Sequence, residues 1–306
     1  MKTVGIIGIN GFAGRYLRKE LETSGYDVWG VDIQSFDDKT VQANMLDATA
    51  VDAIISEKKP DYLVNLAGQA SPGVSWERVV DTMHMNIDIS VNIIDAVRKH
   101  CPNTRMLFIG SANQYDTDTI KGPINESAKQ KSGSPYAVSK VAQESLLWLL
   151  AEKFNLDIIM TRSFNHIGPG QRPGFVVTDY CTRIVALERG ESETMEIRSM
   201  DAWRDFADVR DTVRAYRLLL EKGHKGEVYN VGSGKAYYIQ DIIASLISMS
   251  DVAKAKVTLP DSKKETGTAN RNYSDNGKIF AHTGFEPKID ICDTLKDVLN
   301  DYRSHT

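Results

Sequence analysis

Ser111, Tyr136 and Lys140 have the residue types of a proton-transfer site. A tyrosine hydroxyl has an ordinary pKa of about 10, so it transfers protons at neutral pH only where a nearby positive charge favours its phenolate. Tyr136 and Lys140 are four residues apart, and on one helix that spacing places both side chains on the same face. We take these three as candidate catalytic residues. On the spacing alone, an exposed helical pair and a turn serine are equally good interpretations.

A glycine-rich turn near the amino terminus indicates which kind of ligand assists this proton-transfer site. Gly8, Gly11 and Gly14 follow the apolar run 3–7 and precede residues 12–21, whose apolar positions recur at helical spacing. Without a Cβ, such a turn lets the backbone approach a pyrophosphate, which then lies at the positive end of the helix. The sequence therefore predicts a dinucleotide-binding unit of strand, loop and helix.

Asp32 supports the same interpretation, because it ends the next apolar segment, residues 28–31. A carboxylate at that place accepts hydrogen bonds from both hydroxyls of an adenosine ribose, which favours NAD over NADP. NAD (NADH) is the expected cofactor, with NADP as the alternative. An ordinary turn glycine at Gly11 and a surface acid at Asp32 would be the plainer interpretation, but the order of strand, loop, helix, strand and acid argues against it.

Composition restricts the classes of partner. The 306 residues, 42% hydrophobic and 25% charged, suffice for one large α/β domain with an appended lobe. A net charge of −4 without a long Lys/Arg cluster offers no surface for nucleic acid or an anionic membrane, and no apolar stretch is long enough to span a bilayer. The three cysteines, Cys101, Cys181 and Cys292, have neither disulfide nor metal-ligand spacing. We expect no metal, a small-molecule partner and a cytoplasmic location.

Strand and helix patterns alternate along the first half of the chain. Strands are expected at 62–66, 105–109 and 157–161, and helices at 81–100 and 136–154. This alternation is typical of an α/β fold with a Rossmann-type doubly wound parallel sheet.

The alternation ends at the glycine- and proline-rich residues 168–174, and a smaller, mostly C-terminal α/β lobe is expected to bind the substrate. Residues 204–223 and 227–231 are predicted to return to the first domain as a helix and a strand, and a last helix is expected near 293–302. The predicted domains are 1–166 plus about 204–231 for the cofactor, and 167–203 with 232–306 for the substrate.

Together these motifs resemble the extended short-chain dehydrogenase/reductase family, also described as NAD-dependent epimerases and dehydratases, over nearly the whole chain. The motifs that carry the resemblance are the turn 8–14, Asp32, Leu66-Ala67-Gly68, Ser111, the run 136–140 and Arg204-Asp205-Phe206. The resemblance implies an enzyme that acts on a nucleoside diphosphate sugar. It also implies a homodimer paired through helices 81–100 and 136–154.

Within this family the chain is most similar to reductases of GDP-4-keto-6-deoxy-mannose, through residues 163–177, with support from 69–76, 204–211 and 226–231. The implied cofactor contacts are Gly8, Gly11, Phe12, Ala13, Gly14, Asp32, Ile33, Met45, Leu66, Ala67, Gly68, Asn86, Tyr136, Lys140 and His166, the last without proton transfer. The implied substrate contacts are Ala112, Asn113, Asn165, Phe175, Val177 and Arg204. Asn165 and Arg204 would hold the diphosphate, and Phe175 and Val177 would lie near the base. The plainer alternatives are that Asn165 caps a loop, that Arg204 pairs with a local aspartate, and that Phe175 and Val177 belong to the core of the lobe.

Asn113 narrows the reaction. Dehydratases of this family have a glutamate at that position as the base that removes the C5 proton, and an amide cannot replace it. The reactions that remain are reduction, oxidation or 4-epimerisation, all at sugar carbon 4. The alternative that is not an enzyme is a nicotinamide sensor with the same fold. Such sensors commonly lack the tyrosine and lysine.

Two positions depart from the family pattern. Asp116 stands where the family usually has glycine. The family also has an Arg-Pro pair near the C-terminus that binds the diphosphate; here Glu265 and Thr266 stand near that place, and Arg271 or Lys264 would compensate.

Overall fold

Seven parallel strands form the central sheet of this computed structural model, which describes residues 1–120, 122–197, 202–258 and 271–305. The strand order β11-β7-β5-β4-β1-β2-β3, with β1 near the middle, is that of a doubly wound sheet. The predicted fold class is confirmed. The strands are β1 (Thr3–Ile7), β2 (Asp27–Asp32), β3 (Thr40–Gln42), β4 (Tyr62–Asn65), β5 (Arg105–Ser111), β7 (Asp157–Ser163) and β11 (Val228–Val231).

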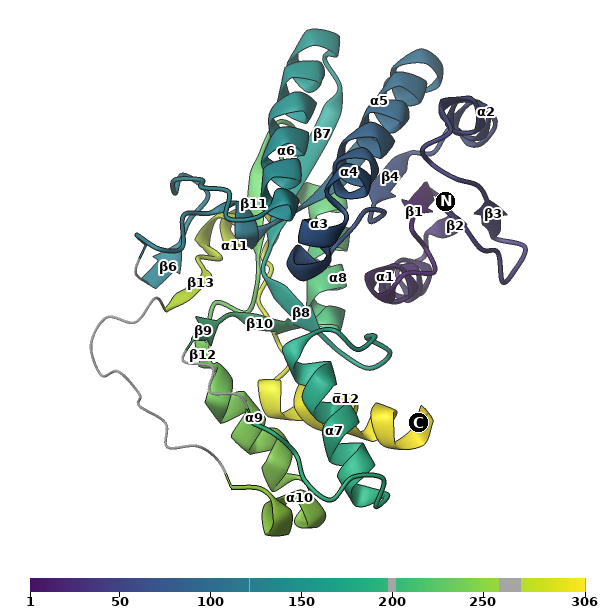
Figure 1. Cartoon of the computed structure of the whole chain (residues 1–306). Helices are drawn as coiled ribbons and strands as arrows, with labels where there is room; N and C mark the ends of the chain where they lie inside the picture. Colours follow the sequence, from purple (N-terminus) through teal and green to yellow (C-terminus); the bar gives the residue numbers. More distant parts are fainter. Residues whose placement is uncertain (121, 198–201, 259–270, 306) are drawn as a thin grey trace.

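Helices cover both faces of this sheet (Figure 1), and each face has its own apolar core. Adjacent strand residues point to opposite faces, so Ile6 belongs to the core under α1 and α8 while Ile7 belongs to the core under α2, α5 and α6. The helices of this domain are α1 (Phe12–Thr23), α2 (Ala48–Lys58), α3 (Pro72–Glu77), α4 (Val79–Met83), α5 (Ile89–His100), α6 (Pro135–Phe154), α8 (Val209–Lys222) and α11 (Gly277–Thr283). A π-helical turn (His84–Asp88) joins α4 to α5, and a 3₁₀ turn (Ala112–Gln114) follows β5.

A smaller lobe lies beyond the carboxyl ends of the strands, with a separate core (Figure 1). Its helices are α7 (Val176–Glu188), α9 (Ile239–Ser248), α10 (Asp251–Lys256) and α12 (Ile291–His305). Outside the central sheet, the described residues form three pairs of short strands: β8 (Asn165–Ile167) with β10 (Phe206–Asp208), β9 (Trp203–Arg204) with β12 (Tyr237–Tyr238), and β6 (Gly122–Ile124) with β13 (Asn272–Ser274).

The structure differs from the sequence-based expectation in two places. The helix expected from residue 204 begins at Val209, because residues 203–208 pair as short strands and the Asp208 carboxylate caps the helix by accepting the Arg210 N–H at 2.7 Å. Residues 277–285 fall inside the predicted substrate lobe, yet Ile279 and Phe285 pack into the first domain's core with α8.

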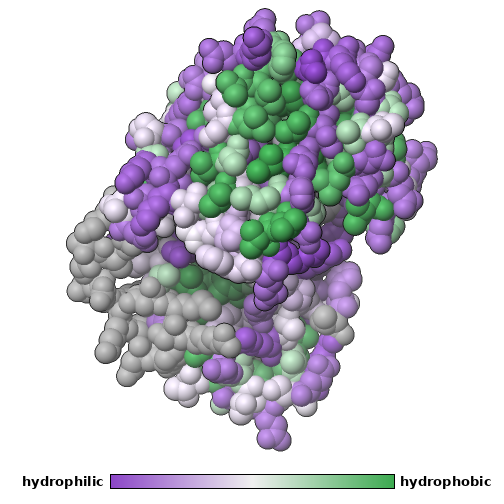
Figure 2. All heavy atoms as spheres, turned by 45° about the horizontal axis from the view of Figure 1, so that its top comes forward, coloured by the Kyte–Doolittle hydropathy of each residue, from purple (hydrophilic) through white to green (hydrophobic). Residues whose placement is uncertain are grey.

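Exposed apolar side chains lie on the outer side of the first domain. Val79 and Val80 on α4 and Val138 and Leu149 on α6 are between 41% and 66% exposed, and the two helices lie against each other. Figure 2 shows hydrophobic side chains gathered over this domain. Among the described residues, none of the helices combines the length and the apolar character that crossing a bilayer requires.

The turn between β1 and α1 depends on glycine. Gly8 has φ +84° and its N–H donates to the Val31 carbonyl at 2.8 Å. A Cβ on Gly14 would lie 2.2 Å from the Gly8 carbonyl oxygen and 2.6 Å from that of Ile9. Both neighbours are backbone atoms, so they cannot move aside as a side chain would. The first turn of α1 therefore packs directly on the loop.

We expect Gly14→Ala to destabilise the protein by about 1–3 kcal/mol, the usual result of overpacking a closely packed site. Thermal unfolding measures this. Gly133→Ala is the matched control, because a Cβ there meets no atom within 4 Å among the described residues. Equal melting temperatures for Gly14→Ala and Gly133→Ala would contradict this account of the turn.

Candidate active site

The glycine turn fits the pyrophosphate of a dinucleotide. Helix α1 begins at Phe12, and no side chain caps its first N–H groups. Uncapped N–H groups at the positive end of a helix bind an anion well. The close backbone packing at Gly14 lets the chain present these groups without an intervening side chain.

Asp32 lies at the end of β2, beside this turn. Its Oδ2 accepts the Asn10 N–H at 3.0 Å and its Oδ1 accepts the Ile33 N–H at 2.8 Å. A carboxylate has about four acceptor positions, so both oxygens keep capacity for ribose hydroxyls. The Asp32 side chain thus holds the turn in place and offers acceptors at the same time, which fits its expected role.

His166 approaches the turn from the other side. Its ring stacks on that of Phe12 with centroids 6.0 Å apart and planes 5° apart. Burial lowers the pKa of His166 below its ordinary value, so the ring is neutral at pH 7. This agrees with an expected role in lining the cofactor without moving a proton.

Among the other expected cofactor contacts, Asn86 and Met45 are buried. The Asn86 side chain accepts the Gln69 N–H at 2.9 Å, and donates to the Gln69 carbonyl at 3.2 Å and to Ser139 Oγ at 2.8 Å. Since its amide donors and acceptor have protein partners, the structure gives Asn86 a positioning role: it joins the loop after β4 to helix α6. Leu66, Ala67 and Gly68 lie in that loop, where a Cβ on Gly68 would be 2.5 Å from Asn86 Oδ1. The side chain of Met45 is only 5% exposed.

The structure brings Ser111 and Tyr136 together. Ser111 ends β5, Tyr136 lies in the first turn of α6, and each side chain is almost completely buried. Burial raises the pKa of Tyr136, and a hydrogen bond with Ser111 opposes that rise. Ser134 caps the helix by accepting the Ala137 N–H at 3.2 Å, which fixes the turn that carries Tyr136.

The predicted effect of Lys140 on the Tyr136 phenolate stays a prediction, because burial and the hydrogen bond with Ser111 are what shift the pKa of Tyr136. The Nζ of Lys140 donates to the Ile109 carbonyl at 2.8 Å and to Gln143 Oε1 at 3.2 Å. Burial lowers the pKa of Lys140 to about 8, so the lysine itself resists carrying charge. For Tyr136, burial outweighs the influence of any neighbour.

Gln114, which was not among the expected site residues, holds Ser111 in place through buried polar contacts. Gln114 Oε1 accepts the Ser111 N–H at 2.8 Å, and Gln114 Nε2 donates to Glu144 Oε2 at 2.7 Å. Glu144 also accepts from Arg162 Nε at 2.9 Å. A serine followed three residues later by glutamine is a capping-box signal that identifies Gln114. Glu144 and Arg162 have no local signal, because their pairing depends on the packing of α6 against β7.

Of the expected diphosphate residues, Arg204 lies on β9 and Asn165 on β8. Arg204 is exposed and its Nη1 donates to the Trp203 carbonyl at 2.8 Å; within the described ranges it forms no ion pair, so pairing with a local aspartate is not observed. Arg271 lies over the Trp203 ring, 4.3 Å from its centroid. Asn165 is exposed and donates to the Asp205 carbonyl at 3.0 Å. Lys264, Glu265 and Thr266 lie outside the described residues.

The remaining expected substrate residues differ in exposure. Ala112 and Asn113 follow Ser111 in the 3₁₀ turn, and Asn113 is exposed and lines a pocket of about 330 Å³. Phe175 is 39% exposed just before α7. Val177 is only 1% exposed and packs in the core of the smaller lobe, which corresponds to the plainer of its two interpretations.

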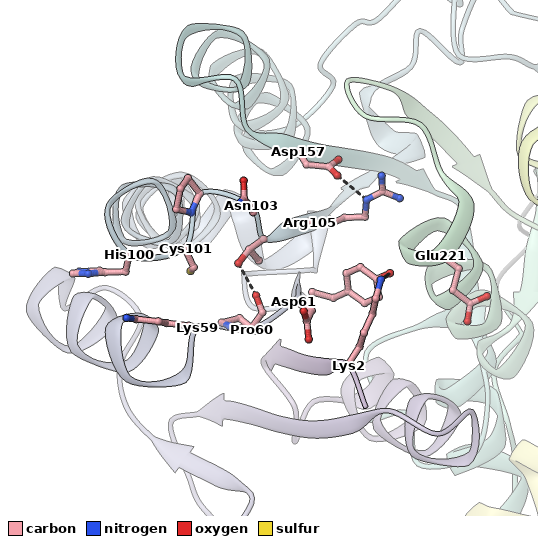
Figure 3. Close-up of a pocket in the computed structure, with 13 residues that line it drawn as sticks. Lys2, Lys59, Pro60, Asp61, His100, Cys101, Asn103, Arg105, Asp157 and Glu221 are labelled. Carbon is pink, nitrogen blue, oxygen red and sulfur yellow. Dashed lines mark hydrogen bonds and ion pairs between the residues drawn. The ribbon is translucent and has the colours of Figure 1, made fainter.

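A larger pocket, of about 630 Å³, lies at the other end of the sheet (Figure 3). It is lined by Lys2, Asp61, Arg105 and Asp157, which lie at the amino ends of β1, β4, β5 and β7. Arg105 Nε donates to Asp157 Oδ2 at 2.8 Å, an ion pair within the wall. Ligands of doubly wound sheets bind at the carboxyl ends of the strands, where Asp32 and Ser111 lie. We therefore assign the active site to the carboxyl ends, although the pocket there is smaller.

Comparison with known proteins gives a consistent result. The model of the NAD dependent epimerase/dehydratase family matches residues 4–232. The GDP-6-deoxy-D-mannose reductase of Pseudomonas aeruginosa is 28% identical over 305 residues, covering 98% of this chain and 96% of that protein. The structure of the Pseudomonas aeruginosa protein RMD complexed with NADPH has a TM-score of 0.85 at 27% identity, with both chains covered completely.

A second solved structure is equally similar in fold. UDP-glucose 4-epimerase from Thermotoga maritima, with UDP-glucose, has a TM-score of 0.87 at 25% identity and covers 99% of both chains. The family match extends over the glycine turn, the buried serine, tyrosine and lysine, and the return of the chain to the sheet. The chain belongs to the NAD dependent epimerase/dehydratase family and is an NAD(P)-dependent sugar-nucleotide enzyme of the extended short-chain dehydrogenase/reductase type.

Proposed function

We propose that this protein reduces a nucleotide-activated 4-keto-6-deoxy sugar, GDP-4-keto-6-deoxy-D-mannose, to a GDP-6-deoxyhexose. The observation that carries this proposal is the similarity to a GDP-6-deoxy-D-mannose reductase along nearly the full length of both chains. The exposed amide of Asn113 agrees with it, since dehydration would need a carboxylate base at that position. Residues 163–177, on which the resemblance to these reductases rests, include His166, whose ring stacks on Phe12 at the glycine turn.

The described residues suit the reductive direction. A dinucleotide held at its pyrophosphate by the glycine turn would supply the hydride that reduces the C4 carbonyl. Tyr136 donates a proton to the carbonyl oxygen, and Ser111 donates a hydrogen bond to the same oxygen. A general acid must hold its proton until the reaction, and burial, which raises the pKa of Tyr136, keeps the phenol protonated. Lys140 then restores the proton or stabilises the phenolate that remains.

The charges beside Trp203 suit a diphosphate. Arg204 and Arg271 place two exposed guanidinium groups beside Trp203. Arginine binds phosphate oxygens in bidentate geometry, which suits it to such a site. The buried Asp205 carboxylate accepts the N–H groups of Ser233 at 2.8 Å and Ser274 at 2.9 Å, and so fixes the backbone that carries Arg204.

A 4-epimerase acting on a UDP-hexose is the second candidate, and the fold similarity to the Thermotoga maritima epimerase favours it. Such an enzyme would use Ser111, Tyr136 and Lys140 in the same places. It would keep its NAD bound, and the hydride would return to the opposite face of the sugar. It would consume no added NADH.

The first prediction from the proposed function concerns turnover. With GDP-4-keto-6-deoxy-mannose, the purified protein should oxidise NADH, measured by absorbance at 340 nm, and NADH should be preferred to NADPH because Asp32 repels a 2′-phosphate. Tyr136→Phe should lose about 10²–10⁴-fold in kcat, the contribution of general acid catalysis. Tyr26→Phe is the control, since its hydroxyl bonds Glu221 at 2.9 Å, away from the site.

The same experiment separates the two candidates. UDP-glucose and GDP-mannose are run in parallel with a reaction lacking substrate. Formation of UDP-galactose from UDP-glucose, with no NADH oxidation by the keto sugar, would replace the reductase by the epimerase. Full turnover by Tyr136→Phe would exclude the mechanism for both.

The second prediction concerns pH. Burial lowers the pKa of Lys140 to about 8, so Lys140 is charged below that pH and becomes neutral above it. If the charged lysine is needed, kcat/KM, which reports on the free enzyme, falls above pH 8. In Lys140→Arg the guanidinium stays charged, and its residual rate should not fall in that range. Coincident falling limbs in the two pH profiles would refute the assignment to Lys140.

The third prediction concerns assembly. We infer that two copies pair through helices 81–100 and 136–154, the second of which carries the exposed side chains of Val138 and Leu149. Sedimentation velocity should show a dimer, and Leu149→Glu, at a side chain that is 63% exposed, should give a monomer because it places a charge in the contact. Phe280→Glu, at an apolar residue on α11 that is 51% exposed, should leave the dimer intact. A monomeric wild type would contradict the inference.

A further inference from the structure

A pocket of about 330 Å³ has Asn113 and Ala137 in its lining, and these residues lie close in the chain to Ser111 and Tyr136. Trp76 on α3, Asp116 and Lys131 also line it. Its volume lies at the lower end of the range of small-molecule sites, about 300–1,000 Å³.

Asp116 is the unusual residue of this pocket. It is only 2% exposed, and its buried Oδ1 has no hydrogen-bond partner among the described residues. The Nζ atoms of Lys131 and Lys129 lie 3.8 Å from Oδ1 and Oδ2 respectively, too far for hydrogen bonds. Lys131 is also engaged by Asp118 at 2.9 Å. Burying a carboxylate oxygen without a donor is unfavourable, so a donor from outside the described chain is expected here.

The carboxylate is held in a fixed place. The Asp116 N–H donates to the Lys129 carbonyl at 2.8 Å, and the hydroxyl of the preceding Tyr115 donates to Asn230 Oδ1 at 2.7 Å. A side chain on a backbone secured in this way needs little reordering when a ligand arrives. Asp116 is therefore prearranged to accept a hydrogen bond.

The residues that line the pocket favour a neutral sugar over an anionic one. Two carboxylates, Asp116 and Asp118, and one cation, Lys131, line the pocket, so a hydrogen-bond donor fits this lining better than a further carboxylate does. A neutral ring with hydroxyl groups supplies the missing donor. The Trp76 side chain is 65% exposed and offers an apolar surface to the C–H face of such a ring.

We propose that Asp116 accepts a hydrogen bond from a ring hydroxyl of the hexose and so determines which sugar is bound. This rests on the proposed function, since it takes the sugar of that substrate as the occupant. Asp116 takes no part in the transfer of hydride or proton. It therefore acts on sugar binding and leaves the chemical step unchanged.

Calorimetric titration of the full chain with GDP and with GDP-mannose tests the proposal without turnover. In the wild type GDP-mannose should bind more tightly than GDP. In Asp116→Asn the affinity for GDP-mannose should fall roughly tenfold, as for loss of a hydrogen bond to a charged group, while the affinity for GDP stays the same. With the keto sugar, the variant should show a raised KM and an unchanged kcat.

Asp251→Asn is the control, because it removes a carboxylate that is 99% exposed and that bonds Lys254 on α10, outside this pocket; it should bind GDP-mannose as the wild type does. Equal binding of GDP-mannose by Asp116→Asn and the wild type overturns the proposal, and an ordered water is then the partner of Oδ1. If Asp116→Asn does not fold, wild-type binding of 2-deoxy and 3-deoxy analogues of GDP-mannose decides: one analogue should bind about tenfold more weakly, and equal affinities overturn the proposal. Failure of the wild type to bind both GDP and GDP-mannose overturns the proposed function and this proposal together.

Discussion

The ion pair between Arg162 and Glu144 holds the catalytic parts of this protein together. Arg162 lies on β7, Glu144 lies on α6 one turn beyond Lys140, and both side chains are almost fully buried. Gln114 extends the pair to the turn that begins at Ser111. Removing one partner of a buried pair usually costs about 3–5 kcal/mol, against a typical total stability of about 5–15 kcal/mol. The positions of Ser111 and Tyr136 thus depend on one desolvated interaction.

The parallel sheet supplies the second constraint. In a parallel sheet every strand ends at the same edge, so the residues that follow β1, β2, β4 and β5 meet there whatever their separation in the chain. The glycine turn, Asp32, the loop 66–69 and Ser111 all come from these strand ends. Lys140 joins them because its Nζ bonds the Ile109 carbonyl on β5. The helix that carries the lysine is thereby tied to the sheet edge that receives the cofactor.

Features set by neighbouring residues in the chain were predictable from the sequence. The spacing of Gly8, Gly11 and Gly14 predicted the tight turn, in which a Cβ on Gly14 would overlap backbone atoms. The periods of the strands and helices predicted the sheet that follows. Features set by packing between distant elements were not predictable. Glu144 and Arg162 appear in the sequence as ordinary charges, and Asn86 gives no sign that its amide bonds Gln69 and Ser139.

The pKa of Tyr136 shows the same limit. The four-residue spacing correctly placed Lys140 on the same helix, but spacing carries no information on burial or on which carbonyl Nζ bonds.

The protein offers two different electrostatic environments to the two ends of the proposed substrate. Around Tyr136 and Lys140 the charged forms of both side chains are disfavoured, because burial removes their solvation. A proton held in such a region is given up only when negative charge develops on a nearby atom, as on the oxygen of a carbonyl that accepts a hydride. Arg204 and Arg271 have exposed side chains beside Trp203, and a diphosphate would supply a counter-charge for Arg204, whose pKa burial lowers. A substrate with a charged diphosphate at one end and a neutral keto sugar at the other fits this division, whereas a substrate charged at both ends would leave one charge in the region least able to solvate it.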